Sequence, residues 1–125
     1  MRLLIAKSFD FDAAHFLPNV PDGHKCKRLH GHTYQVEVIC EGEPDERGMV
    51  VDYADLARAW LPIHAVVDHR ALNEVPGLEN PTSEVLALWL LDRFVSAVPE
   101  TVAVRVYESS STWCEAARRT AEGAR

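Results

Sequence analysis

Residues 32–41 read HTYQVEVICE, and apolar side chains alternate with polar ones along most of this stretch. The side chains that fall on one face are Tyr34, Val36, Val38 and Cys40. A period of two predicts a β-strand with one face in a hydrophobic core. The upstream stretch 3–14, LLIAKSFDFDAA, alternates phenylalanine with aspartate over its second half and predicts the partner strand of a hairpin. Prolines and a glycine mark residues 16–29 as the loop between them.

Two helices are predicted downstream of this hairpin. The first begins after Asp52, whose carboxylate can cap the free backbone N–H groups of the first turn, and Pro62 should kink or loosen its middle. Its apolar stripe consists of Leu56, Trp60, Ile63 and Val67. The second helix begins at Asn80-Pro81, with asparagine as the cap and proline at the first position. Its expected buried stripe is Val85, Leu88, Leu91 and Val95, broadened by Leu86, Trp89 and Leu90.

The C-terminal part of the chain completes the sheet. Residues 101–107 alternate again and predict a third strand, and residues 112–118 predict a short fourth one. The order β-β-α-α-β-β favours an α+β fold in which a four-stranded antiparallel sheet carries both helices on one face. The chain has 125 residues, and we expect one domain, 1–125, with a frayed tail from about residue 119.

The charge balance excludes two classes of partner. Thirteen basic and nineteen acidic side chains leave a formal net charge of −6, and both nucleic acids and anionic membranes require a basic surface. The uncharged apolar runs are far too short to span a bilayer. Three widely spaced cysteines argue against a disulfide framework. We therefore expect a soluble cytoplasmic protein with no nucleic acid and no membrane as its partner.

Three histidines are predicted to converge at one end of the hairpin. His30 and His32 lie two residues apart and share a strand face, and His15 ends the partner strand. Imidazole nitrogens suit zinc, and three protein ligands leave one position open for water or substrate, as in catalytic sites. The alternative is that these histidines are polar residues on a solvated hairpin end. The predicted convergence of three imidazoles at one place favours a metal site over this alternative.

Cys26 precedes this histidine pair in the pattern C-x3-H-G-H. The spacing leaves open whether Cys26 is a fourth metal ligand, a catalytic thiol beside the metal, or a small buried residue in a basic loop. Three cations flank it: Lys25, Lys27 and Arg28. Nearby positive charge favours the reactive thiolate, but the same cations could instead bind an anionic group of a substrate.

Two further positions carry carboxylates that chemistry could use. Asp68 precedes His69 and could orient or charge its imidazole as an acid–base pair. Adjacent residues usually point apart, however, and histidine at a helix C-terminus is a common structural choice. Glu108 continues the two-residue spacing of the valines in this strand, so it falls on the strand's apolar face. A buried carboxylate needs donors, which the edge of a flat amidine-like ring would provide, whereas a strand end that frays into solvent needs none.

Taken together, these motifs resemble those of a known family. They occur in the order found in the 6-pyruvoyltetrahydropterin synthase superfamily, and the C-x3-H-G-H spacing is most similar to its bacterial 6-carboxytetrahydropterin synthase branch. The matching motifs are Phe11-x-Ala-Ala-His15, Cys26-x3-His-Gly-His32, Val67-Asp-His69, Leu72-Asn73, Pro81-Thr-Ser-Glu84 and Glu108. The resemblance spans nearly the whole chain, and the joint set is far more specific than any one motif.

This resemblance implies a fold, an assembly and a set of roles. The fold would be a tunnelling fold, in which trimers close their sheets into a barrel and two trimers stack as a homohexamer with active sites between subunits. The implied zinc ligands are His15, His30 and His32. The implied catalytic residues are the thiol Cys26 and its partners Asp68 and His69, which a neighbouring subunit would supply. The implied pterin-binding residues are Glu108, Thr82 and Ser83.

The implied activity is that of a zinc-dependent lyase acting on a small molecule, 7,8-dihydroneopterin triphosphate. Zinc would act as a Lewis acid on the side-chain hydroxyls, Cys26 would remove a side-chain proton, and His69 with Asp68 would manage protonation of the ring. The products would be 6-carboxy-5,6,7,8-tetrahydropterin, acetaldehyde and triphosphate, on a route to 7-deazaguanines such as queuosine. Two alternatives remain: the sibling reaction that yields 6-pyruvoyltetrahydropterin, and a non-catalytic, zinc-stabilised oligomer that binds a pterin.

Overall fold

The computed structural model describes residues 1–119, so the tail expected from about residue 119 lies, apart from Arg119, outside the described residues. The strands are β1 (Leu3–His15), β2 (His30–Gly42), β3 (Arg70–Ala71), β4 (Thr101–Ser109) and β5 (Thr112–Ala117). The helices are α1 (Tyr53–Val67) and α2 (Ser83–Ala97), with short 3-10 turns η1 (Lys25–Lys27) and η2 (Leu72–Glu74). The predicted order of four strands and two helices is therefore confirmed among the elements longer than three residues.

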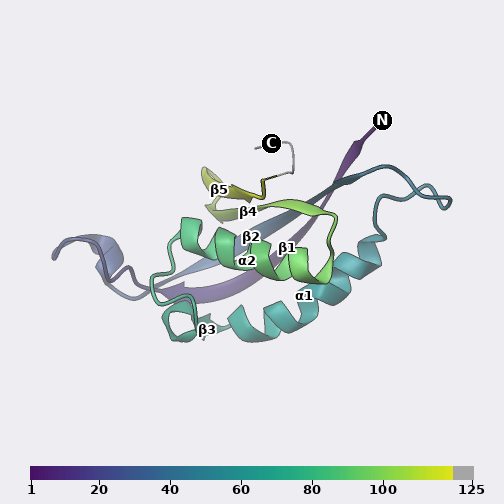
Figure 1. The fold of residues 1–125 in the computed structure, drawn as a ribbon. Coiled ribbons are helices and arrows are strands. Elements are labelled where there is room, and N and C mark those ends of the chain that lie inside the picture. The colour runs from purple at the N-terminus through teal and green to yellow at the C-terminus, as the bar shows by residue number, and fades with distance from the viewer. Residues whose placement is uncertain (120–125) are drawn as a thin grey trace.

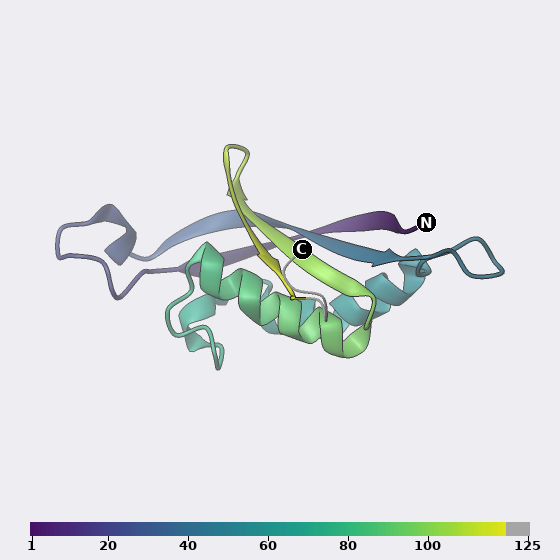
Figure 2. The same cartoon turned by 45° about the horizontal axis from the view of Figure 1, so that its top comes forward.

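The sheet has five strands in the order β3-β1-β2-β4-β5 and is mixed, not four-stranded and antiparallel as predicted (Figure 1). The additional strand, β3, pairs parallel with β1 at Ala13 and Ala14. Two residues are too few to show an alternating pattern, so periodicity could not reveal this strand. Both helices cover one face of the sheet, as predicted, while the opposite face lies open in the monomer (Figure 2).

The hairpin of β1 and β2 provides the centre of the core. Its register pairs His15 with His30 and Phe11 with Tyr34, and paired residues of antiparallel strands point to the same face. Phe11 and Tyr34 are buried beneath the helices with their rings stacked 4.9 Å apart. The predicted stripe of α1 is buried in full, and Asp52 caps the helix by accepting from the Ala54 N–H at 2.8 Å. α1 is continuous through its internal proline.

The second helix differs from the prediction in its start and in its buried face. Its cap is Thr82, whose hydroxyl accepts from the Val85 N–H at 3.1 Å, so Asn80 and Pro81 lie outside the helix. The buried residues are Leu86, Ala87, Trp89, Leu90, Leu91 and Phe94. Leu91 of the predicted stripe is buried, and so are the three residues predicted to broaden it. Val85 and Val95 are half-buried against the core, whereas Leu88 is 62% exposed. Because α2 carries apolar residues on most of its sides, its packing against β4 and β5 decides which side is buried.

This assignment predicts different costs for two chemically identical substitutions in α2. Leu90→Ala should lower the free energy of unfolding by about 2–5 kcal/mol, because it leaves a cavity in a fully buried site. Leu88→Ala should change it by less than about 0.5 kcal/mol, as exposed positions usually do. Urea unfolding of both variants measures the difference, and equal losses would mean that the buried face is assigned wrongly.

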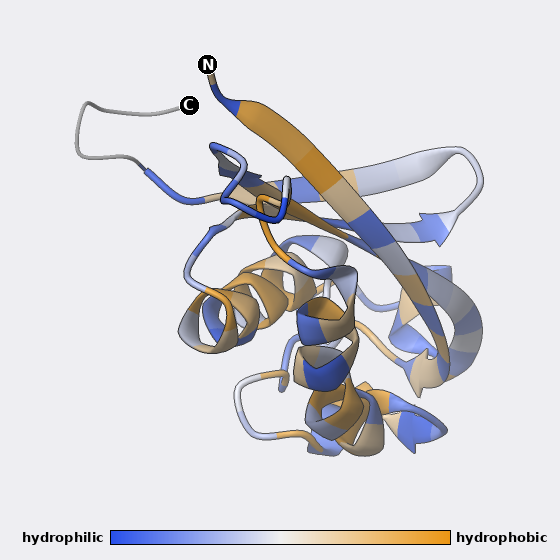
Figure 3. Cartoon of the chain, turned by 90° about the vertical axis from the view of Figure 1, so that its right-hand side faces the viewer, coloured by the Kyte–Doolittle hydropathy of each residue, from blue (hydrophilic) through white to orange (hydrophobic). Residues whose placement is uncertain are grey.

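The N-terminal half of β1 is apolar and exposed (Figure 3). Leu3 and Leu4 are 45% and 56% exposed. Because β3 pairs only with residues 13 and 14, the outer edge of β1 before them has no strand partner among the described residues. Such an edge presents free backbone donors and acceptors to another chain.

Candidate metal centre

The paired ends of β1 and β2 bring three imidazoles together. Each of His15, His30 and His32 offers a ring nitrogen, and these three atoms lie within 4.8 Å of one another. The ring centroids are 4.6 to 5.0 Å apart and the rings are nearly perpendicular. The convergence predicted from the hairpin is confirmed, and no other group of this kind occurs within residues 1–119.

Two backbone carbonyls determine which ring nitrogens face the centre of the cluster. A carbonyl oxygen only accepts, so the Nδ1–H of His15 donates to the Pro81 oxygen at 2.8 Å, and the Nδ1–H of His30 donates to the Arg28 oxygen at 2.7 Å. When both rings are neutral, their Nε2 atoms therefore carry lone pairs, and these two atoms lie 3.0 Å apart. Two lone pairs at this distance repel each other unless a cation lies with them, which is the donor chemistry of a metal site.

Burial favours the neutral form of the central imidazole. His15 is only 1% exposed, and burial lowers its pKa below the ordinary 6.5, although the Pro81 carbonyl and the Glu108 carboxylate act in the opposite direction. The Glu108 Oε2 lies 3.9 Å from the His15 Nε2. The hydroxyl of Tyr34 lies 3.1 Å from the His15 Nδ1, and burial raises the Tyr34 pKa far above its ordinary value, so it stays neutral.

A cavity of about 440 Å³ lies beside the cluster and contains two more of the predicted site residues. Cys26 and Glu108 line it together with the three histidines. Cys26 is half-buried and is held in η1, where its N–H donates to the His24 Nδ1 at 3.0 Å and its carbonyl accepts from the Leu17 N–H at 2.8 Å. One cavity within a single chain is thus lined by a thiol, a carboxylate and three imidazoles.

Asp68 and His69 form a close pair but do not line that cavity. The Asp68 Oδ2 lies 2.7 Å from the His69 Nδ1, although adjacent residues usually diverge. The conformation is possible because His69 has a left-handed backbone, φ 56°, and its N–H donates to the Asp12 carbonyl at 2.6 Å. His69 borders a different cavity of about 600 Å³, which β1, β2 and β3 line.

The Asp68–His69 pair makes the titration of His69 a test of the geometry. Asp68 raises the His69 pKa above 6.5, while the Asp12 N–H and then His69 lower the Asp68 pKa below 3.8. The pair therefore stabilises the fold fully between pH 3.8 and 6.5, and loses this contribution as Asp68 protonates below that window or His69 deprotonates above it. Asp68→Asn should lower the His69 pKa, as NMR titration of the ring protons can measure. An unchanged pKa would contradict the pairing.

The two predicted residues at the start of α2 also lie outside the cavity of Cys26. The Thr82 hydroxyl is engaged as the helix cap, and Ser83 is the first helical residue. Their connection to the cluster is through the backbone, because the preceding Pro81 carbonyl orients His15.

Comparison with known proteins shows the family of this chain. A family model described as 6-pyruvoyl tetrahydropterin synthase matches residues 4–119. The chain belongs to that family. A 6-carboxy-5,6,7,8-tetrahydropterin synthase of Synechocystis sp. is 38% identical over 116 residues, which cover 87% of this chain and 88% of the relative.

Two other matches broaden the comparison. A dihydroneopterin monophosphate aldolase of Pyrococcus furiosus is 34% identical over 105 residues, covering 84% of this chain and 86% of the relative. The structure of Caenorhabditis elegans 6-pyruvoyl tetrahydropterin synthase matches with a TM-score of 0.86 at 26% identity, covering 94% of this chain and 96% of that one. The chain is thus similar to 6-carboxytetrahydropterin synthases, which are lyases of the 6-pyruvoyl tetrahydropterin synthase family.

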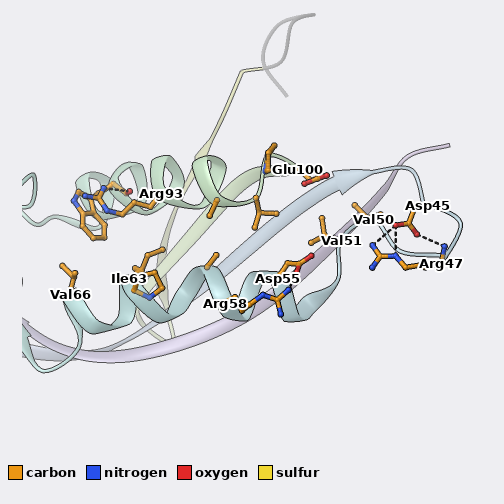
Figure 4. A pocket seen from close by; sticks show the side chains of 16 residues that line it. Asp45, Arg47, Val50, Val51, Asp55, Arg58, Ile63, Val66, Arg93 and Glu100 are labelled. Carbon is orange, nitrogen blue, oxygen red and sulfur yellow. Dashed lines mark hydrogen bonds and ion pairs between the residues drawn. The ribbon is translucent and has the colours of Figure 1, made fainter.

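A larger cavity of this synthase-family chain lies elsewhere, between α1 and α2 (Figure 4). It measures about 880 Å³, and most of its charged side chains have partners. Arg47 binds Asp45 at 2.8 Å, Arg58 pairs with Asp55, and Arg93 stacks on the Trp89 ring. Its lining contains neither histidine nor cysteine, so it offers no comparable metal chemistry.

Sequence reasoning missed several polar partners of the site. The His64 Nε2 lies 3.5 Å from the Asp68 Oδ2, and the Asp12 N–H donates to the Asp68 Oδ1 at 3.0 Å. The spacing of His64 and Asp68 by four residues at a helix end was the available signal. The backbone contacts join residues more than fifty positions apart and left no signal in the sequence. Among the described residues no helix is both long and apolar enough to cross a membrane.

Proposed function

We propose that this chain is a zinc-dependent lyase that converts 7,8-dihydroneopterin triphosphate and water to 6-carboxy-5,6,7,8-tetrahydropterin, acetaldehyde and triphosphate. The observation that carries the proposal is the single cavity in which Cys26 and Glu108 adjoin three imidazole donors. The similarity to 6-carboxytetrahydropterin synthases supports this reaction. Its product would serve the synthesis of 7-deazaguanines of the queuosine type.

The donor set of His15, His30 and His32 fits zinc, which prefers neutral imidazole nitrogens and takes three protein ligands in catalytic sites. When bound, zinc would supply Lewis acidity toward the hydroxyls of the substrate's side chain. The two carbonyls that hold Nδ1–H of His15 and His30 act as outer partners that fix ring orientation.

The remaining site residues would have two roles, which are proton transfer and substrate binding. Cys26, as the thiolate, would take a proton from the substrate's side chain, since it lines the same cavity as the imidazoles. Glu108 would accept two hydrogen bonds from the amino group and ring N–H of the pterin, which gives its part-buried carboxylate the donors it needs. Thr82 and Ser83 would complete the pterin contacts from the start of α2.

We further propose that Asp68 and His69 act in a neighbouring subunit's site, within a homohexamer of two barrel-forming trimers. Two features of the monomer support this assignment. The pair lies outside the cavity of its own chain's Cys26, and the apolar edge of β1 has no partner strand. Mixing Cys26→Ala chains with His69→Ala chains should restore turnover in the mixed oligomer. Mixed hexamers as inactive as either parent, or a fully active monomer by light scattering, would contradict the shared site.

Two neighbouring reactions are candidates for the same cavity. The relative from Pyrococcus furiosus, 34% identical, is a dihydroneopterin monophosphate aldolase, so aldol cleavage of a monophosphate is the second candidate. The structural match to a 6-pyruvoyl tetrahydropterin synthase makes the 6-pyruvoyl product the third. A non-catalytic pterin-binding oligomer would not need a thiol beside the metal.

One experiment distinguishes these activities. The zinc-loaded protein is incubated separately with dihydroneopterin triphosphate and dihydroneopterin monophosphate, and the products are identified by mass spectrometry. We expect 6-carboxytetrahydropterin and acetaldehyde from the triphosphate. A 6-pyruvoyl product, turnover of the monophosphate alone, or binding without turnover would each replace the proposed reaction with the corresponding alternative.

A further inference from the structure

The three cations around Cys26 have different surroundings, which their sequence order does not show. The Lys27 ammonium donates to the Asp22 carboxylate at 2.7 Å and to the Val20 carbonyl at 3.3 Å. Both partners belong to the same loop, so the Lys27 ammonium is already paired within it. Arg28 is exposed and does not line the cavity of the histidine cluster.

Lys25 is the one of the three that borders the cavity, beside Cys26 and the imidazoles. It makes no ion pair with any described residue up to Arg119. The loop that carries it is closed by the Leu17 N–H bond to the Cys26 carbonyl, and the Lys27 N–H and Arg28 N–H bond back into η1. Lys25 is therefore an unpaired cation on a braced turn, at the edge of the space that holds the thiol.

The charged residues of the cavity determine how an anionic ligand would be oriented in it. Its other charged residue is Glu108, and its histidines are neutral when they offer lone pairs to a metal. A phosphate group is repelled by the Glu108 carboxylate and attracted by the Lys25 ammonium. In a protein of net charge −6, such a local cation is what allows a highly charged anion to approach.

We propose that Lys25 is a specificity-determining residue that binds the phosphate chain of the substrate, while Lys27 and Arg28 do not. The assignment rests on the proposed function, because it takes the ligand to be a phosphorylated pterin. Lys25 then distinguishes phosphorylated from unphosphorylated pterins and keeps the phosphate away from Glu108. Because the lysine ammonium is a compact point charge, it contacts only one part of the chain of phosphates.

The test compares two ligands and two matched variants. Neopterin and neopterin triphosphate are fluorescent and have a fully oxidised ring, so they bind without being consumed. Their dissociation constants are measured for the full-length metal-loaded protein, Lys25→Gln and Lys27→Gln. Lys25→Gln should weaken binding of neopterin triphosphate by about 10- to 100-fold, as expected for one charged hydrogen bond. Binding of neopterin should stay unchanged, Lys27→Gln should alter neither constant, and Lys25→Arg should restore the preference.

Each other outcome has a defined meaning. Equal weakening of both ligands in Lys25→Gln would show a structural role, and equal effects of Lys25→Gln and Lys27→Gln would show a general charge effect. Either result overturns the assignment. A wild-type protein that binds neopterin and its triphosphate equally also overturns it but leaves the pterin site standing. A wild-type protein that binds neither overturns the proposed function and this inference together.

Discussion

Replacing His30 with alanine is expected to remove nearly all bound metal and to abolish turnover. The substitution deletes one of three nitrogen donors, and the remaining pair cannot hold the ion in an open site. Loss of an outer-shell partner alone costs roughly 10- to 100-fold in metal affinity, so loss of a direct ligand should cost more. Metal content by mass spectrometry of the purified protein, together with turnover of dihydroneopterin triphosphate, measures both effects.

The His30→Ala chain should remain folded, because His30 is half-buried at the end of the hairpin and away from the main core. Far-UV circular dichroism checks this. The matched control is His64→Ala, which removes an imidazole that lies outside the cluster and should leave metal content unchanged. Full metal occupancy in folded His30→Ala would show that the ligands are assigned wrongly.

Cys26→Ala is the second large effect we expect, and it separates the two chemical roles that the sequence leaves open. As the proton acceptor, Cys26 can be lost with the metal retained, while turnover falls by on the order of 10²-fold or more. As a fourth metal ligand, its loss would instead lower the metal content. Metal analysis and turnover of the same preparation therefore distinguish these roles, and we expect retained zinc with lost turnover.

The control for Cys26→Ala is Cys114→Ala, which removes a half-buried thiol from β5, away from the cluster's cavity. It should change neither metal content nor turnover. Retained zinc together with unimpaired catalysis in Cys26→Ala would refute both roles and leave Cys26 as a structural residue of the loop.

The hairpin and its histidines could be predicted from the sequence because the relevant physics is local. A strand repeats every two residues, so His30 and His32 share a face whatever surrounds them, and the hairpin pairing returns the chain beside His15. The same holds for α1, whose polar and apolar sides are distinct and whose start has a capping aspartate. Where one face is clearly apolar, periodicity and capping are sufficient.

The second helix shows where this reasoning fails. Leu88 and Leu90 are the same residue type two positions apart, yet one is 62% exposed and the other fully buried. A helix that is apolar on most sides has no preferred face of its own, and its contacts with β4 and β5 decide which stripe is covered. Its start was misplaced for a related reason, because Asn80, Thr82 and Pro81 all satisfy local capping rules.

By itself, the sequence determined the β1–β2 hairpin, the convergence of His15, His30 and His32, and the stripe of α1, because these depend on periodicity over a few residues. Only the tertiary structure decided the rest. The Pro81 carbonyl, 66 residues away, sets the tautomer of His15, and a contact with Asp12 holds Asp68 beside His69. Lys25 and Lys27 are equivalent in composition and spacing, and the folded loop turns Lys27 to Asp22 and leaves Lys25 beside the cavity. Such contacts join segments that are distant in the chain, and no local pattern encodes them.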